Sequence, residues 1–126
     1  MSKKIVVVED HPAVRRVLTL SLRQRGYEIV EAITGRSGIA LTSEENPDLV
    51  LVDLSLPDLS GLEVAKRIKQ NPETAKIPLV ALSGCTEREL ALKTLESGMA
   101  AYLTKPAATQ ELVNVIENLT EPRSLP

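Results

Sequence analysis

Short apolar runs alternate with stretches of helical periodicity along the whole chain. Four of the runs consist almost entirely of Val, Leu, Ile and Ala. A fifth run, at residues 28–32, has fewer apolar residues and is more polar. Apolar runs of this length are typical of buried strands, whereas apolar residues three or four positions apart are typical of helices. We expect strands at residues 4–9, 28–32, 48–53, 78–82 and 100–103.

The helical stretches between these runs have recognisable ends. Pro12 suits a first helical turn and Gly26 a helix stop, which predicts the first helix. Thr86 and Glu89 have the spacing of a capping box at the start of the fourth helix. The apolar stripe of the first helix contains Val14, Val17, Leu18 and Leu22. We expect helices at about residues 12–25, 35–45, 62–70, 87–97 and 109–119.

Strand followed by helix, five times over, predicts an α/β domain. The strands of such a (βα)5 chain form a parallel sheet with helices on both faces. In a flavodoxin-like, doubly wound sheet the strand order is 2-1-3-4-5, which places the first and third strands side by side. The more polar second strand then lies at an edge. We expect one domain over residues 1–120, followed by a C-terminal tail or the start of a linker at 121–126.

Composition and charge narrow the classes of function. The 126 residues are 43% hydrophobic and 25% charged, which is typical of a soluble globular domain. A net charge of -2 gives no strong attraction to nucleic acid or to anionic membranes. The apolar runs are far too short to insert into a membrane. Cys85, the single cysteine, cannot form an internal disulfide, and a cytoplasmic location is the simplest interpretation.

Polar residues suited to phosphoryl chemistry follow four of the predicted strands. Glu9 and Asp10 follow the first strand, and Asp53 ends the third. Ser83 follows the fourth strand, and Lys105 the fifth. The carboxyl ends of parallel strands share one edge of a sheet, where open α/β folds bind ligands. Three neighbouring carboxylates repel one another unless a cation intervenes, and Mg²⁺ prefers such oxygen ligands.

These strand ends resemble the receiver domain of two-component response regulators. The resemblance rests on Glu9-Asp10, on the segment from Asp53 to Gly61, on Ser83-Gly84 and on Lys105-Pro106. It extends from Lys4 to about Leu119. Each motif alone is a weak signal, but all of them in this order at strand ends are specific.

The resemblance implies a phosphoacceptor site. Asp53 would take a phosphoryl group from a phosphohistidine on a histidine kinase or a histidine phosphotransfer protein, giving an aspartyl phosphate. Asp10 and Asp53 would bind Mg²⁺ directly, Glu9 would act through water, and the backbone carbonyl of Ser55 would add a further ligand. Such a module is a signalling phosphoacceptor rather than an enzyme, although it would phosphorylate and dephosphorylate itself.

The resemblance also implies a conformational switch. Lys105 would neutralise one phosphoryl oxygen, Ser83 would donate a hydrogen bond to another, and the Lys105–Pro106 bond would be cis. Tyr102 has two interpretations. Taken alone, it is a half-buried strand residue with its hydroxyl in water. As the family's switch residue, it would rotate inward when phosphorylation draws Ser83 toward Asp53, and the surface of the fourth helix, fifth strand and fifth helix would change.

Partners follow from the same resemblance. The histidine-bearing partner would dock on the start of the first helix and on the loop after the fifth strand. A downstream output protein or a fused effector domain would read the switched surface, and the resemblance also admits a phosphorylation-linked dimer. The sequence does not name the kinase or the output. The docking residues would be Ala13, Val14, Val17 and Pro106.

Several alternatives stay open at this point. A haloacid-dehalogenase-type phosphohydrolase also uses a strand-end Asp with Mg²⁺, but its second acid would stand where this chain has Ser55. A pseudo-receiver, an interaction module that is never phosphorylated, is a second alternative, and the intact set of Asp10, Asp53, Ser83 and Lys105 argues against it. Ser55 and Cys85 occupy positions that tune hydrolysis in the family, and their short side chains suggest a long-lived phosphoryl group, although Cys85 is equally well a small tolerated residue. We expect His11 to be solvated.

Overall fold

Strands and helices alternate throughout the described residues. The structure is a computed structural model and describes residues 2–85 and 87–120. The predicted tail at 121–126 lies outside the described residues. The elements are β1 (Lys4–Val8), α1 (Pro12–Gln24), β2 (Glu28–Ala32), α2 (Gly35–Glu45), β3 (Leu49–Asp53), α3 (Gly61–Gln70), β4 (Leu79–Ser83), α4 (Arg88–Glu96), β5 (Ala101–Thr104) and α5 (Thr109–Thr120).

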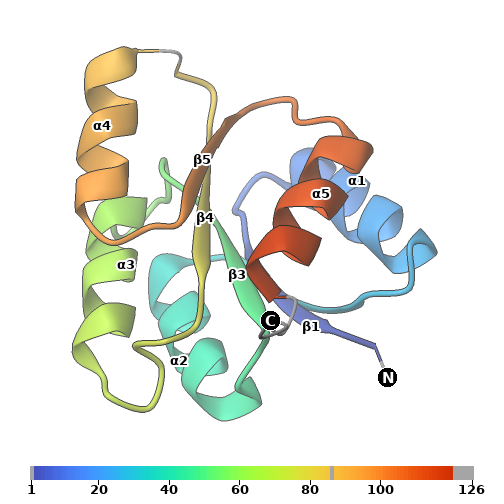
Figure 1. The fold of residues 1–126 in the computed structure, drawn as a ribbon, viewed down its shortest axis with the longest axis horizontal. Coiled ribbons are helices and arrows are strands. Elements are labelled where there is room, and N and C mark those ends of the chain that lie inside the picture. Colours follow the sequence, from blue (N-terminus) through green and yellow to red (C-terminus); the bar gives the residue numbers. More distant parts are fainter. Residues whose placement is uncertain (1, 86, 121–126) are drawn as a thin grey trace, which may run out of the picture.

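The five strands form one parallel sheet in the order β2-β1-β3-β4-β5. The predicted (βα)5 architecture and strand order are therefore confirmed. β2 lies at one edge, in keeping with its polar sequence. β1 and β3 are neighbours, and Val8 pairs with Val52, so the two strands end at the same level. Figure 1 shows the helices on both sides of the sheet.

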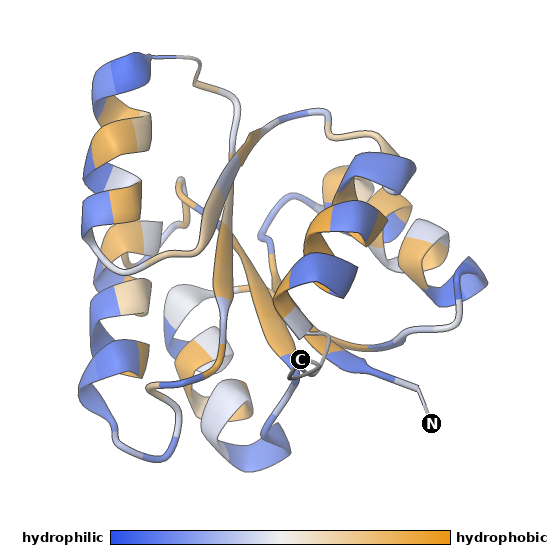
Figure 2. Cartoon of the chain, in the orientation of Figure 1, coloured by the Kyte–Doolittle hydropathy of each residue, from blue (hydrophilic) through white to orange (hydrophobic). Residues whose placement is uncertain are grey.

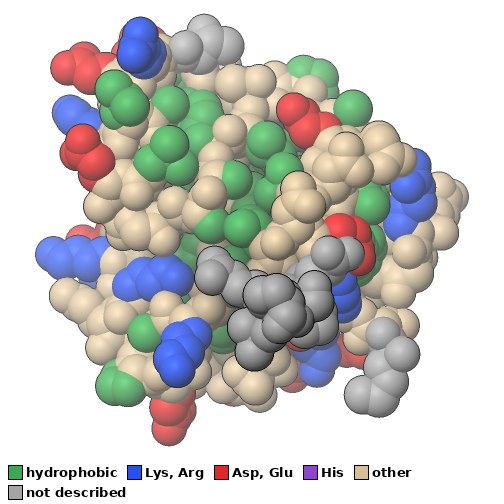
Figure 3. Space-filling model, in the orientation of Figure 1, with side chains coloured by type: hydrophobic (Ala, Val, Ile, Leu, Met, Phe, Trp, Pro, Cys, Tyr) green, Lys and Arg blue, Asp and Glu red, His purple; other side chains and the backbone are tan. Residues whose placement is uncertain are grey.

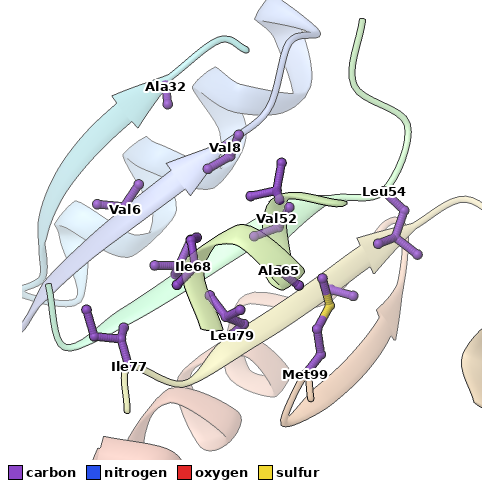
Figure 4. Close-up of a cluster of buried hydrophobic side chains, with 13 residues drawn as sticks. Val6, Val8, Ala32, Val52, Leu54, Ala65, Ile68, Ile77, Leu79 and Met99 are labelled. Atoms are coloured by element: carbon purple, nitrogen blue, oxygen red, sulfur yellow. The ribbon is translucent and has the colours of Figure 1, made fainter. Parts of the chain in front are cut away.

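Each face of the sheet has its own hydrophobic cluster. β3 and β4 are buried along their whole length, because helices cover both of their faces. On one face, strand residues pack with α3, and Figure 4 shows Ala65 and Ile68 of this helix over Val52 and Leu79. On the other face, strand residues pack with Leu18 of α1 and Ile116 of α5. Figure 2 shows the strands as hydrophobic and the outer sides of the helices as polar.

Several element boundaries differ by one residue from the predicted ones. α4 begins at Arg88, and its N-cap residue is Glu87, which makes no side-chain capping bond. Thr86, the predicted cap, lies outside the described residues. β4 and β5 each begin and end one residue later than predicted, and at their carboxyl ends Ser83 pairs with Thr104 in the ladder.

Among the described helices, none has both the length and the apolar character that crossing a bilayer requires.

The amino ends of the strands carry a group of charged side chains that are half-buried or exposed. Lys3 Nζ lies 2.9 Å from Glu117 Oε1, and the Tyr27 hydroxyl donates a hydrogen bond of 2.5 Å to Glu117 Oε2. Lys4 Nζ lies 3.3 Å from Glu45 Oε1, and its backbone amide donates to Asp48. These contacts tie α2 and α5 to the start of the sheet. We call this group the amino edge.

Candidate functional site

The carboxyl ends of β1 and β3 bring the three predicted acids together. Because these strands are adjacent and in register, Glu9 and Asp10 after β1 meet Asp53 at the end of β3. One carboxylate oxygen of each residue lies within 4.8 Å of the others. This group, with Lys105, is called the carboxyl edge below.

The three acids differ in their exposure to solvent. Glu9 is 1% exposed and Asp53 is 4% exposed, whereas Asp10 is exposed. The cluster therefore has two desolvated carboxylates and one that opens to water. An ion could enter from the side of Asp10 and reach the buried oxygens behind it.

Lys105 pairs with both buried acids. Its Nζ lies 2.5 Å from Glu9 Oε1 and 3.2 Å from Asp53 Oδ1. Burial raises the pKa of Glu9, and the charge of Asp53 adds to this, although hydrogen bonds from Lys105 and from the His11 amide oppose it. Burial alone would lower the pKa of Lys105, but the contacts with Glu9 and Asp53 outweigh burial and raise it. The direct pair of Lys105 with Glu9 is a contact that the sequence reasoning missed.

The donor set fits a hard divalent cation. Three carboxylates face one ammonium group, so the cluster carries excess negative charge in a partly desolvated place. Opposite ligands of Mg²⁺ are about 4.2 Å apart, so oxygens within 4.8 Å need only small movements to bind one ion. The amide of Ser55 donates a 3.1 Å hydrogen bond to Asp53 Oδ1, which keeps the Ser55 backbone beside the cluster.

Ser83 stands at the same edge but contacts its own loop. It is 4% exposed, and its Oγ accepts a 3.0 Å hydrogen bond from the Cys85 amide. Ser83, Ser55 and Cys85 line one cavity of about 490 Å³ between the loops that follow β3 and β4. The structure therefore places the Ser83 hydroxyl next to open space beside the loop that follows Asp53.

Tyr102 points to the loop after β4. Its hydroxyl donates a 2.5 Å hydrogen bond to the carbonyl oxygen of Cys85, and the ring packs against the hydrophobic cluster around α3. The interpretation with the hydroxyl in water is therefore wrong. A partner 17 residues away in sequence satisfies the hydroxyl, and strand periodicity gives no sign of it.

Arg15 holds the backbone of the loop after β1. Its Nη1 donates to the carbonyl oxygens of Glu9 at 3.0 Å and of Asp10 at 3.3 Å, and its Nε lies 3.3 Å from Glu31. The side chain of Arg15 is only 19% exposed, so it is engaged by this loop and by Glu31 instead of extending into solvent. His11 is exposed, as expected, and its Nδ1 also caps α1 by accepting from the Val14 amide at 3.4 Å.

The predicted docking residues lie together beside Lys105. Ala13, Val14 and Val17 of α1 and Pro106 line a single groove of about 300 Å³, and the Lys105–Pro106 peptide bond is cis. Val17 is 65% exposed although it belongs to the apolar stripe of α1, whereas Leu18 and Leu22 are buried. Contiguous apolar surface, such as the lining of this groove, is typical of a contact surface, whereas a single exposed apolar residue is not.

The comparisons with known proteins agree with this geometry. The family model described as response regulator receiver domain matches residues 5–117. The phosphate regulon transcriptional regulatory protein PhoB of Pseudomonas aeruginosa is 35% identical over 113 residues, which are 90% of this chain and 49% of that protein. RpaA of Synechocystis, a DNA-binding dual master transcriptional regulator, is 32% identical over 87% of this chain and 46% of its own length. The chain thus spans about half the length of these curated relatives.

Solved structures extend the comparison to the site. The CheY-like receiver domain protein of Methanospirillum hungatei has a TM-score of 0.85 and 30% identity, covering 96% of both chains. The receiver domain of sensor histidine kinase PA1611 from Pseudomonas aeruginosa has a TM-score of 0.90 and 25% identity, covering 97% of this chain and 100% of its own. That structure holds a magnesium ion in its active site cleft. With its strand order, its acidic cluster and these matches, the chain belongs to the response regulator receiver domain family.

Proposed function

We propose that this chain accepts a phosphoryl group on Asp53 with the help of Mg²⁺. The observation that carries the proposal is the meeting of Asp53, the other two acids and Lys105 at one edge of the sheet. Phosphoryl transfer depends on positioning and on neutralisation of charge more than on proton transfer. A cation and an ammonium group beside a buried carboxylate meet that requirement.

Each residue then has a chemical role. An Asp53 oxygen forms a bond to phosphorus while the bond between phosphorus and the histidine nitrogen of the partner breaks. Asp10, Asp53 and the Ser55 carbonyl would hold Mg²⁺, and Glu9 would support it through water. When bound, the ion neutralises charge on the phosphoryl oxygens. Lys105, which forms ion pairs with Glu9 and Asp53 in the structure, contacts another of these oxygens.

Ser83 and Tyr102 transmit the event to the surface. Ser83 Oγ accepts from the Cys85 amide and can donate its own proton to a phosphoryl oxygen, so movement of Ser83 toward that oxygen pulls on the loop after β4. The hydrogen bond of Tyr102 to the Cys85 carbonyl couples β5 to the same loop. α4 follows this loop and buries only Thr94, so its packing is easily shifted. Figure 3 shows hydrophobic side chains gathered between α4 and α5. This surface changes as the population shifts between two packings.

The proposed partners act on two different surfaces. A histidine kinase or phosphotransfer protein docks in the groove lined by Ala13, Val14, Val17 and Pro106. An output protein or a fused effector domain reads the surface of α4, β5 and α5, and phosphorylation promotes any dimer that forms there. Because the relatives PhoB and RpaA are named as transcription regulators, a transcriptional output is favoured, with DNA contacted outside residues 1–120. The site of action is the cytoplasm.

The direct experiment is phosphorylation by acetyl phosphate followed by intact-mass measurement. With Mg²⁺ we expect one added phosphoryl group on the wild-type protein, and none on Asp53→Asn or in EDTA. Hydrolysis of p-nitrophenyl phosphate distinguishes a receiver from the phosphohydrolase alternative. A phosphohydrolase turns this substrate over many times, whereas a receiver does not. An unchanged wild-type mass in the presence of Mg²⁺ would contradict the proposal and favour a pseudo-receiver.

The phosphoryl group is proposed to be long-lived. Ser55 and Cys85 line the cavity beside the acceptor loop, and neither side chain is long enough to hold a hydrolytic water near Asp53. The mass of the phosphorylated protein, followed after removal of acetyl phosphate, measures the lifetime. Loss of the phosphoryl group within seconds would contradict this proposal of a long lifetime.

A further inference from the structure

Asp58, in the loop between β3 and α3, is bound to the start of a different helix. Its Oδ1 accepts a 2.8 Å hydrogen bond from the Gly35 amide, and its Oδ2 accepts a 3.0 Å bond from the Arg36 amide. These are the first two residues of α2, whose amides have no partner within the helix. Both carboxylate oxygens are therefore engaged by one helix end, where the helix dipole favours negative charge.

α2 also has a cap of its own. Thr34 and Ser37 form a capping box, in which Thr34 Oγ1 accepts from the Ser37 amide at 3.0 Å. The helix start is thus held from within the helix as well as by the loop. The hydrogen bonds to Asp58 do more than cap α2, because they also fix the position of the loop.

The tip of the loop is pressed closely against α2. A Cβ atom added to Gly35 would lie 2.9 Å from Val64 Cγ2, 3.1 Å from Leu59 Cβ and 3.2 Å from Asp58 Oδ1. Contacts under 3.0 Å require something to shift. The contact under 3.0 Å is with Val64 of α3, and the two contacts with the loop are only slightly longer, so Gly35 suits the close approach of both α3 and the loop to α2.

The base of the same loop borders the phosphoacceptor. Ser55 pairs with Ser60 in an isolated antiparallel bridge, and the Gly61 amide donates to the Leu54 carbonyl at 3.1 Å. The Ser55 amide in turn holds Asp53 Oδ1 at 3.1 Å. A loop this short, closed at its base, transmits the position of its tip to Ser55.

We propose that Asp58 is a positioning residue, which anchors the loop on α2 and thereby holds the Ser55 backbone where it serves Asp53 and the metal site. The inference rests on the proposed function for its metal readout, and on the hydrogen bonds of the metal-free protein for the rest. It assigns to α2, which contributes no residue to the site, the task of keeping one wall of the site in place.

The test compares Asp58→Ala with Thr34→Ala as the matched control. Both variants weaken the start of α2, but only Asp58→Ala frees the loop. In metal-free protein, we expect hydrogen exchange at the Ser55 and Gly61 amides to accelerate by about tenfold or more in Asp58→Ala through local opening, and not in Thr34→Ala. In a Mg²⁺ titration followed by NMR, we expect Asp58→Ala to weaken affinity by roughly three- to tenfold, near the low end for groups that orient metal ligands.

Asp58→Asn refines the test, because its single carbonyl oxygen can hold one of the two amides. We expect exchange rates and Mg²⁺ affinity between those of wild type and Asp58→Ala. Equal effects of Asp58→Ala and Thr34→Ala would show that Asp58 is only a helix cap and would overturn the inference, as would an Mg²⁺ affinity within twofold of wild type. A wild-type protein that binds no Mg²⁺ would instead overturn the proposed function, and amide exchange would still decide whether Asp58 restrains the loop.

Discussion

The two edges of the sheet carry similar residues in different surroundings. At the amino edge, Lys3 pairs with Glu117, whose side chain is 40% exposed. At the carboxyl edge, Lys105 pairs with Glu9, whose side chain is 1% exposed, and also with Asp53. Water screens the first pair and is largely excluded from the second.

The difference in burial separates structural charges from functional ones. An exposed pair can lose a partner with little effect, because water solvates the charge that is left. A buried cluster with more carboxylates than cations is held in an unfavourable state that a metal ion relieves. The carboxyl edge is therefore poised to bind, whereas the amino edge ties α5 to the sheet.

Removal of a lysine from each edge gives the largest expected contrast. Lys105→Met leaves Glu9 and Asp53 buried beside each other, and we expect it to lower the free energy of unfolding by about 3 kcal/mol in EDTA. Lys3→Met breaks an exposed pair and should lower it by less than about 1 kcal/mol. Urea unfolding of the two variants measures both values. An equal decrease in the free energy of unfolding for the two variants would show that the two edges do not differ in this way.

Mg²⁺ should stabilise the protein through the carboxyl edge alone. An ion that binds only the folded state adds about 2.7 kcal/mol at a hundredfold excess over its dissociation constant. We expect that gain in wild type and in Glu117→Gln, and its loss in Asp53→Asn, when urea unfolding is compared with and without Mg²⁺. A gain that persists in Asp53→Asn would place the ion elsewhere.

The smallest expected contrast is in the pH dependence of stability. Burial raises the pKa of Glu9 above its usual 4.5, so the metal-free folded state keeps a proton that the unfolded state has lost. Stability from this group therefore falls as pH rises from about 4.5 through the raised pKa. The hydrogen bond from Tyr27, with Lys3, lowers the pKa of Glu117, so its contribution is lost as pH falls below 4.5 through the lowered pKa.

Single variants separate the two titrations. In urea unfolding across pH in EDTA, Glu9→Gln should flatten the slope above 4.5, and Glu117→Gln should flatten the slope below it. Slopes unchanged by either substitution would contradict the assignment of these two groups.

The sequence predicted those site residues whose positions are set by the ends of strands. Asp10, Asp53 and Lys105 follow apolar runs, and parallel strands bring such residues to one edge whatever the details of packing. Thr104 shows the limit, because the ladder extends into a residue that the apolar pattern excludes. Element boundaries of this kind depend on pairing with a neighbouring strand, which has no local signal.

The contacts that the sequence did not reveal join residues far apart in the chain. Lys105 meets Glu9 across 96 positions, and Asp58 meets Gly35 across 23. Such contacts depend on how helices pack on the sheet, and the residue types alone are equally consistent with solvated loops. Arg15 is the same case on a smaller scale, since helical periodicity places it at the surface but does not show that it reaches back to the Glu9 carbonyl.

The most direct test of the account is to locate the phosphoryl group chemically. Reduction of the acetyl-phosphate-treated protein with borohydride converts an aspartyl phosphate to homoserine, and peptide mass spectrometry finds its position. The account predicts homoserine at position 53, only when Mg²⁺ was present. Homoserine at another acid, or none at all in a protein that gained phosphoryl mass, would contradict the claim that the carboxyl edge makes Asp53 the acceptor.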